Sequence, residues 1–188
     1  MNGARARLGA ALVLTAAGAA LALSGAPAAS AAVPWGAGCT TDPPGPARTS
    51  ASCGAELAGA RAIAPPEAPA LVKRVIAAAN QINTRPYVWG GGHVSWFSRG
   101  YDCSGAVGYA LHGADLLETT MVSGQLAGWG DAGVGRWITV YANSHHVFMV
   151  VAGLRFDTRD APPGVTGPRW HRASVDTRNF LARHPAGL

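Results

Sequence analysis

Apolar residues recur at helical spacing between about residues 68 and 82, where the chain has its first clear periodic pattern. Five apolar residues would share one face of this helix: Val72, Val75, Ile76, Ala79 and Ile82. Lys73, Arg74 and Asn80 would lie on the opposite, solvated side. The helix should end before Pro86, because a proline biases the residue that precedes it away from helical geometry.

A second helical pattern begins near Cys103 and runs to about Leu116. Four apolar residues fall at positions i, i+3, i+4 and i+7: Val107, Ala110, Leu111 and Ala114. Asp102 is a suitable N-cap for this helix. The segment PYVWGGGH precedes it, and its three glycines permit close approach of the backbone to another part of the chain.

Three apolar segments follow, at residues 136–141, 147–153 and 154–158, and each is expected to form a β-strand. The polar, glycine-rich stretch 119–135 is expected to be loop with one short turn. After these strands the chain reads as loop, with residues 169–175 as the candidate for a last strand. Helices that precede a group of strands indicate an α+β domain with a central antiparallel sheet.

The first 31 residues have the pattern of a secretory signal peptide. Arg5 and Arg7 precede an uncharged run from Leu8 to Leu23, and Ala29-Ser30-Ala31 is an A-x-A cleavage site. A membrane anchor needs about 20 apolar residues, more than this run contains. We therefore expect cleavage, export from the cytoplasm and no stable membrane insertion.

Residues 32–66 are rich in Pro, Ala and Gly and are expected to form an irregular arm, followed by one folded domain at 67–188. Cys39 and Cys53 lie in the arm and are candidates for one disulfide, which would leave Cys103 as a free thiol. Loss of the leader lowers the formal net charge from +5 to +3. Without a cluster of basic residues, that charge gives no reason to expect a nucleic-acid partner.

Cys103 is the residue whose local sequence most clearly indicates chemistry. At the first turn of a helix, unpaired backbone N–H groups and the helix dipole stabilise a thiolate, the nucleophilic form of cysteine. Gly105 keeps the neighbouring position small, so that a substrate can approach the thiol. The alternatives are a buried structural thiol and a cysteine in an intermolecular link.

A thiolate nucleophile needs a base, and the candidates are histidines. His145 and His146 open the strand at 147–153, where a side chain can be directed rigidly at a neighbouring element. Adjacent strand residues face opposite ways, so only one of the two can point at the thiol. His112 and His184 are expected at the surface, and His93 is a candidate for either the cleft lining or an ordinary turn.

Strand pairing suggests a third member of the site. If residues 152–153 form a two-residue hairpin turn, His146 lies opposite Arg159. Asp157 is then the diagonal neighbour of His146 on the same sheet face, about 7–8 Å away between α-carbons. That separation allows a hydrogen bond between the carboxylate and the imidazole, whereas His145 would face the other side.

Three segments, in this order, resemble the NlpC-type peptidases, a papain-like family of cell-wall hydrolases: PYVWGG (86–91), YDCSGAVGYAL (101–111) and HVFMVV (146–151). The hallmarks of the family are a Y-x-W/Y-G-G loop, a D-C-S-G helix start and a histidine that opens a strand. The segments WITVYANSHHVFMVVAGLRFDT and GPRW are similar to a secreted actinobacterial branch. The resemblance covers about residues 68 to 160.

This resemblance implies a papain-like α+β fold with helices packed on a central antiparallel sheet. It implies Cys103 as nucleophile, His146 as base, Asp157 as the polar third residue and Tyr87 as a hydroxyl that stabilises the oxyanion. The implied reaction is hydrolysis of amide bonds in peptidoglycan stem peptides, commonly the γ-D-glutamyl–diaminopimelate bond, through a Cys103 thioester and without a cofactor. We expect a secreted, cell-wall-associated monomer.

Other readings of the same residues stay open. His145 and Phe148 stand where the family favours smaller residues, which motivates a non-catalytic envelope-binding protein on the same scaffold. A thiol amidase or acyltransferase with another substrate is a further alternative. Metal binding is not expected, because the chain has no H-x-x-x-H or C-x-x-C spacing. Four tryptophans either wall a groove or pack in the core: Trp89, Trp96, Trp129 and Trp170.

Overall fold

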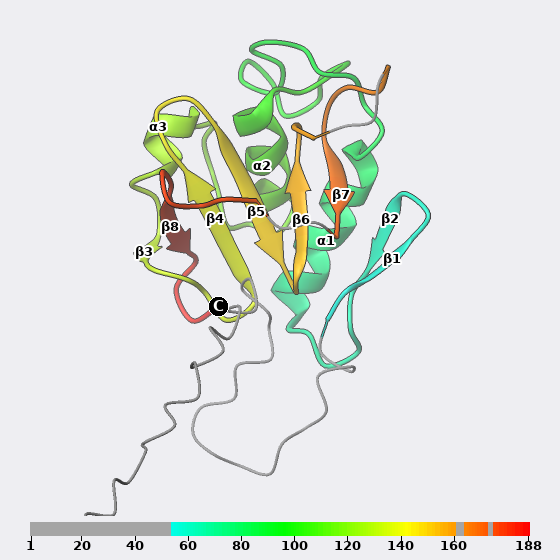
Figure 1. Ribbon diagram of the computed structural model, residues 1–188, viewed down its shortest axis with the longest axis vertical. Coiled ribbons are helices and arrows are strands. Elements are labelled where there is room, and N and C mark those ends of the chain that lie inside the picture. Colours follow the sequence, from blue (N-terminus) through cyan, green and yellow to red (C-terminus); the bar gives the residue numbers. More distant parts are fainter. Residues whose placement is uncertain (1–53, 161–163, 173–174) are drawn as a thin grey trace, which may run out of the picture. The chain divides into compact units, whose positions relative to one another are not determined.

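The computed structural model describes residues 54–160, 164–172 and 175–188 (Figure 1). The expected signal peptide and the Cys39–Cys53 pair lie outside the described residues. In chain order the elements are β1 (Glu56–Ala58), β2 (Arg61–Ile63), α1 (Ala70–Ile82), α2 (Cys103–His112), α3 (Ser123–Leu126), β3 (Asp131–Ala132), β4 (Ile138–Ala142), β5 (Val147–Val151), β6 (Leu154–Asp157), β7 (Arg169–His171) and β8 (Leu181–His184).

Six strands form one sheet in the order β3-β8-β4-β5-β6-β7, and every neighbouring pair is antiparallel. Helix α2 packs on β5 and β6, and α1 packs on α2, so both helices lie on one side of the sheet (Figure 1). The expected α+β architecture, with helices on a central antiparallel sheet, is confirmed. No helix within the described ranges is both long and apolar enough to cross a membrane.

The two central strands are buried on both faces, which explains why β5 reads as an unbroken apolar run. Val147, Met149 and Val151 join the main core with the helices. Phe148 and Val150 point to the opposite face and pack against a smaller cluster that includes residues from the segment before β8 and from β8 itself. A strand covered on both sides loses the alternation of apolar and polar residues that marks a half-exposed strand.

Helix α1 buries the five apolar residues that the spacing predicted. Asn80, which was expected on its solvated side, is instead buried. Its Nδ2 donates to the carbonyl of Ala62 at 2.8 Å, and its Oδ1 accepts from the Ala62 N–H at 3.0 Å and from Trp170 Nε1 at 3.0 Å. A polar side chain is stable in this position because each of its groups has a hydrogen-bond partner.

The partner strand of Asn80 belongs to a two-stranded hairpin, β1–β2, with Leu57 paired to Ala62. The expectation of an irregular arm over 32–66 is therefore wrong for residues 56–63. The hairpin packs on α1 and is further held by Arg172, whose Nη2 donates to the Leu57 carbonyl at 2.9 Å. These residues belong to the folded part of the chain rather than to a linker.

The structure differs from the prediction at the end of one helix and in the C-terminal strands. Helix α2 ends at His112, four residues before the expected Leu116, because Asp115 adopts a left-handed conformation (φ 59°) and Leu116 N–H turns back to the Leu111 carbonyl. Strand β8 was not predicted, and the candidate last strand is β7, an edge strand of three residues. His184 lies in β8 and is half-buried, not in a solvated tail.

Candidate functional site

Cys103 is the first residue of α2 and is half-buried with a free thiol. The Asp102 side chain caps the helix as expected, with its Oδ1 accepting from the Gly105 N–H at 2.8 Å. A Cβ at position 105 would collide with the carbonyl oxygen of Gly91, so glycine at 105 lets the glycine-rich loop lie against the helix start. The N–H of Cys103 has no acceptor within the helix and is available to a ligand.

The β5–β6 hairpin sets the position of the imidazole. Ala152 and Gly153 form the turn, both with positive φ (46° and 82°), and Val151 pairs with Leu154. This is the predicted two-residue turn and the predicted register. His146 and Asp157 are consequently on the same face of the sheet.

His146 and Asp157 form a buried hydrogen-bonded pair. The distance from His146 Nε2 to Asp157 Oδ1 is 2.8 Å, and the two residues are only 4% and 3% exposed. Because Nε2 is used by the carboxylate, Nδ1 is the nitrogen left for the thiol. His145 is exposed and does not take part in this pair, so of the two adjacent histidines only His146 has the geometry of a base.

Further contacts hold both members of the pair. Asn143 Oδ1 accepts from the backbone N–H groups of His145 and His146, each at 2.9 Å, which fixes the turn before β5. Asp157 Oδ1 also accepts from the Arg159 N–H at 3.0 Å, and its Oδ2 lies 3.5 Å from Arg155 Nη1. The carboxylate is thus held by three groups, all of which favour its negative charge.

The electrostatics of the site favour a thiolate–imidazolium pair. Burial acts to raise the pKa of the Cys103 thiol, but hydrogen bonding with His146, the imidazolium charge and the Val147 N–H outweigh it and leave the pKa below its ordinary value. Burial acts to lower the pKa of His146, yet hydrogen bonds with Asp157 and with Cys103, and their negative charges, raise it overall. The pKa of Asp157 is lowered, because its bond to His146 and the nearby positive charges outweigh the effect of burial.

Cys103 and His146 open into a cavity of about 390 Å³. Its lining comprises Tyr87, Trp89, Cys103, His145, His146, Thr158, Arg159, Val165, Thr166 and Gly167. Tyr87 therefore lies in the same cavity as the thiol. Burial and the negative charges of Cys103 and Asp102 raise the pKa of its hydroxyl, against the opposing charge of Arg159, so the hydroxyl stays protonated and can donate at neutral pH.

Residues 165–167, which lead into the GPRW motif and include its first glycine, contribute one wall of this cavity. Gly167 has φ +87°, and a Cβ there would collide with the carbonyl oxygen of Arg85. Thr166 Oγ1 accepts from the Tyr87 N–H at 3.3 Å. These contacts bring two segments that are far apart in the sequence together beside Cys103.

A network beneath the glycine-rich loop was not predicted. His93 Nε2 lies 3.0 Å and 3.1 Å from the two carboxylate oxygens of Asp102 and 3.2 Å from Ser104 Oγ. Asp102 Oδ2 also accepts from the Gly90 N–H at 3.0 Å. His93 therefore supports the start of α2 from behind and does not line the cleft. The G-G-G-H and D-C-S spacings alone do not indicate this contact, because it depends on how the loop folds back.

The four tryptophans have different environments. Only Trp89 lines the cavity of Cys103, and it is 87% exposed. Trp170 is buried against Phe156, and Trp129 is partly buried. Trp96 stacks on His112 with ring centroids 4.1 Å apart.

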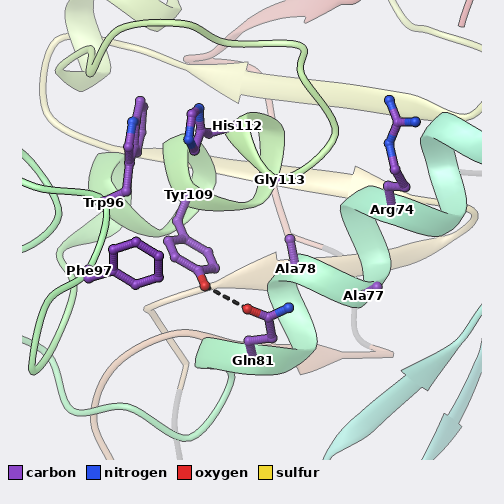
Figure 2. A pocket seen from close by; sticks show the side chains of 9 residues that line it. All are labelled: Arg74, Ala77, Ala78, Gln81, Trp96, Phe97, Tyr109, His112 and Gly113. Carbon is purple, nitrogen blue, oxygen red and sulfur yellow. Dashed lines mark hydrogen bonds between the residues drawn. The ribbon is translucent and has the colours of Figure 1, made fainter.

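Trp96 and His112 line a second cavity of about 250 Å³ between α1 and α2 (Figure 2). Figure 2 also shows Tyr109 directed at Gln81, whose Oε1 accepts from the Tyr109 hydroxyl at 2.7 Å. This cavity is lined by an imidazole and a phenol hydroxyl but by no cysteine and no carboxylate, so it lacks the nucleophile that the proposed reaction needs.

Comparisons with known proteins found similarity at the level of structures only. No family model and no curated protein matches the chain. Among solved structures, the peptidoglycan hydrolase RipB of Mycobacterium tuberculosis is similar, with 24% sequence identity and a TM-score of 0.46 over 60% of this chain and 64% of RipB. A hypothetical invasion protein of the same organism is also similar, with 22% sequence identity and a TM-score of 0.46. The similarity covers 60% of this chain and 61% of the chain of that protein.

The chain thus spans less than two thirds of those two structures. RipD of M. tuberculosis is similar over 62% of this chain and 98% of RipD, with 19% identity and a TM-score of 0.45. RipD is described as a non-catalytic NlpC/p60 domain protein adapted to peptidoglycan binding. NlpC/p60 is the family that the three sequence motifs of this chain resemble.

Proposed function

We propose that this protein is an exported cysteine peptidase of the NlpC type that hydrolyses amide bonds in peptidoglycan stem peptides. The observation that carries the proposal is the arrangement of three side chains: a thiol at a helix start, an imidazole that interacts with it, and a buried carboxylate 2.8 Å from the far nitrogen of that imidazole. A nucleophile, a base and a group that orients the base are the parts that nucleophilic catalysis needs. The three motifs, in their order along the chain, supply the family and the substrate class.

In the first half of the reaction, the Cys103 thiolate attacks the carbonyl carbon of the scissile amide. The negative charge that develops on the carbonyl oxygen is stabilised by the N–H of Cys103 and by the Tyr87 hydroxyl. The His146 imidazolium then donates its proton to the leaving amine, and a thioester on Cys103 remains. Asp157 keeps the imidazole in one orientation and stabilises its charged form.

In the second half, His146 accepts a proton from a water molecule that attacks the thioester. The thiolate leaves, the acyl fragment departs as a carboxylic acid, and His146 is again positively charged beside Cys103. Every proton transfer runs through the imidazole, so the described residues suffice for the chemistry, and we propose that no cofactor takes part.

The two unusual residues around His146 do not favour the binding-only alternative. His145 is exposed and leaves the His146–Asp157 pair intact. Phe148 points to the smaller apolar cluster, where its ring stacks on Tyr141 at a centroid distance of 5.1 Å. Both residues are therefore compatible with catalysis by Cys103. We further propose that the mature enzyme acts as a monomer at the cell wall, after cleavage of the leader.

The test is incubation of the mature chain, residues 32–188, with purified peptidoglycan and with defined stem peptides, followed by mass spectrometry. New fragments that end at the γ-D-glutamyl residue, absent with Cys103→Ala, are the expected result. Binding to peptidoglycan without any fragment would support a non-catalytic envelope protein instead. Cleavage of other thioesters or amides, but not of stem peptides, would support a thiol amidase or acyltransferase.

A further inference from the structure

The cavity around Cys103 has an uneven distribution of charge. Among its lining residues are one guanidinium, that of Arg159, and two imidazoles, those of His145 and His146, but no carboxylate. Two carboxylates lie near the cavity without lining it. Asp157 is paired with His146 and Arg155, and Asp102 caps α2 and is paired with His93. A ligand carboxylate that enters this cavity therefore meets the Arg159 guanidinium and no lining carboxylate.

The backbone of Arg159 is held by a hydrogen bond, whereas its side chain is free to contact a ligand. Its N–H donates to Asp157 Oδ1 at 3.0 Å, which ties the position of the residue to that of the His146 pair. Its side chain is exposed, and no carboxylate among the described residues lies within ion-pair distance of its guanidinium. The adjacent Asp160 lies 2.8 Å from Arg155 Nη1 instead.

The charge of Arg159 also acts close to the proposed oxyanion. Burial has the largest effect on the Tyr87 hydroxyl and raises its pKa, and Arg159 is the one cation that opposes that shift. Arg159 lines the same cavity as Tyr87 and Cys103, so a ligand that occupies the cavity can contact both the guanidinium and the thiol. Carboxylates are the groups that a guanidinium binds best, through two parallel hydrogen bonds.

We propose that Arg159 determines specificity by binding a free carboxylate beside the scissile amide. This inference rests on the proposed function and adds to it the substrate class: stem peptides whose γ-linked glutamyl residue carries an unmodified α-carboxylate, rather than those in which this group is a carboxamide. Arg159 takes no part in bond breaking. Its role is to increase the affinity of the protein for the substrate that carries the carboxylate.

The second cavity offers a matched control. Figure 2 shows Arg74 on α1, at the side of that cavity away from Trp96 and Phe97. The Arg74 guanidinium is already engaged, with Nη2 2.9 Å from the Ala114 carbonyl oxygen and 3.2 Å from Asp115 Oδ2. Arg74→Gln removes the same charge from the protein as Arg159→Gln does, but from a surface that Cys103 does not share.

The experiment measures binding, so that its outcome does not depend on turnover. Two peptides that differ only in the α-carboxylate or α-carboxamide of the γ-linked glutamyl residue are titrated calorimetrically into mature Cys103→Ala protein. We expect the acid to bind about tenfold more tightly than the amide, as one charge-assisted hydrogen-bonded contact at a solvated site provides. Adding Arg159→Gln should make the two affinities similar, because it weakens binding of the α-carboxylate peptide alone. Adding Arg74→Gln should leave the ratio of the two affinities unchanged.

Equal affinities of Cys103→Ala for the two peptides would overturn the proposal, and so would the absence of measurable binding of the acid. An Arg159→Gln change that weakens both peptides by the same factor would overturn it as well, because that result indicates a general effect on the cleft. Cleavage assays with wild-type protein test the proposed function separately. A wild type that cleaves stem peptides without preferring the acid would disprove only the role of Arg159.

Discussion

Replacing Asp157 by Asn isolates the contribution of one charge to the proposed reaction. Asn has the same shape as Asp and retains an oxygen that can accept from His146 Nε2, 2.8 Å away. The change removes the negative charge that stabilises the imidazolium. Both residues are buried, so the interaction is poorly screened by solvent, and a hydrogen bond to a charged group contributes about 1.5–3 kcal/mol. That range corresponds to a fall in kcat/KM of about 10- to 150-fold.

The same substitution should change the titration of the thiol. Asp157 raises the pKa of His146, and the imidazolium in turn lowers the pKa of Cys103. In Asp157→Asn the pKa of His146 falls and the pKa of Cys103 rises, so the two groups share a narrower pH range in which both are charged. The bell-shaped profile of kcat/KM should become narrower, and the rate of Cys103 alkylation should rise only at higher pH than in the wild type.

The assay combines cleavage of a defined stem peptide across pH with iodoacetamide labelling of Cys103, monitored by mass spectrometry. Asp176→Asn is the matched control, because Asp176 forms an exposed ion pair with Arg178 and lies outside the cavity lining. A thermal melt of each variant separates loss of catalysis from loss of folding. An Asp157→Asn enzyme that folds and retains the wild-type rate and labelling profile would refute the reasoning.

Three further substitutions test other parts of the account. Tyr87→Phe removes the proposed oxyanion donor and should lower kcat about 10- to 100-fold, with the affinity for substrate in the Cys103→Ala background unchanged. Asp102→Asn retains a capping oxygen but removes a negative charge that raises the pKa of Cys103, so the pH at which alkylation begins should move down. Asn80→Ala leaves three buried hydrogen-bonding groups of β2 and β7 unpaired and should reduce the free energy of unfolding, measured with urea, by about 3 kcal/mol.

The parts of the fold that the sequence predicted depend on short-range rules. The register of β5 and β6 follows from a two-residue turn at Ala152 and Gly153, and that turn decides which side chains share a face. The choice of His146 over His145 follows from the same rule, because adjacent strand residues face opposite sides of the sheet and only His146 shares a face with Asp157. The cap of α2 by Asp102 needs only the adjacent residues.

The parts that the sequence did not predict depend on contacts between distant segments. Asn80 is polar yet buried, because its partners come from β2 and β7 and no local pattern marks them. Strand β8 is only four residues long and has no alternation of apolar and polar residues, and it exists because β3 and β4 pair with it on either side. His93 pairs with Asp102 only after the glycine-rich loop has folded onto the start of α2.

The measurement that tests the central claim most directly is detection of the acyl-enzyme. Mature protein is mixed with a stem peptide, quenched in acid within one turnover, and analysed intact and after digestion by mass spectrometry. The account predicts an added mass equal to the acyl fragment of the peptide, located on Cys103 and labile to hydroxylamine, as a thioester is. Cleavage of the peptide by Cys103→Ala at the wild-type rate, or an adduct on another residue, would contradict the assignment of Cys103 as the nucleophile.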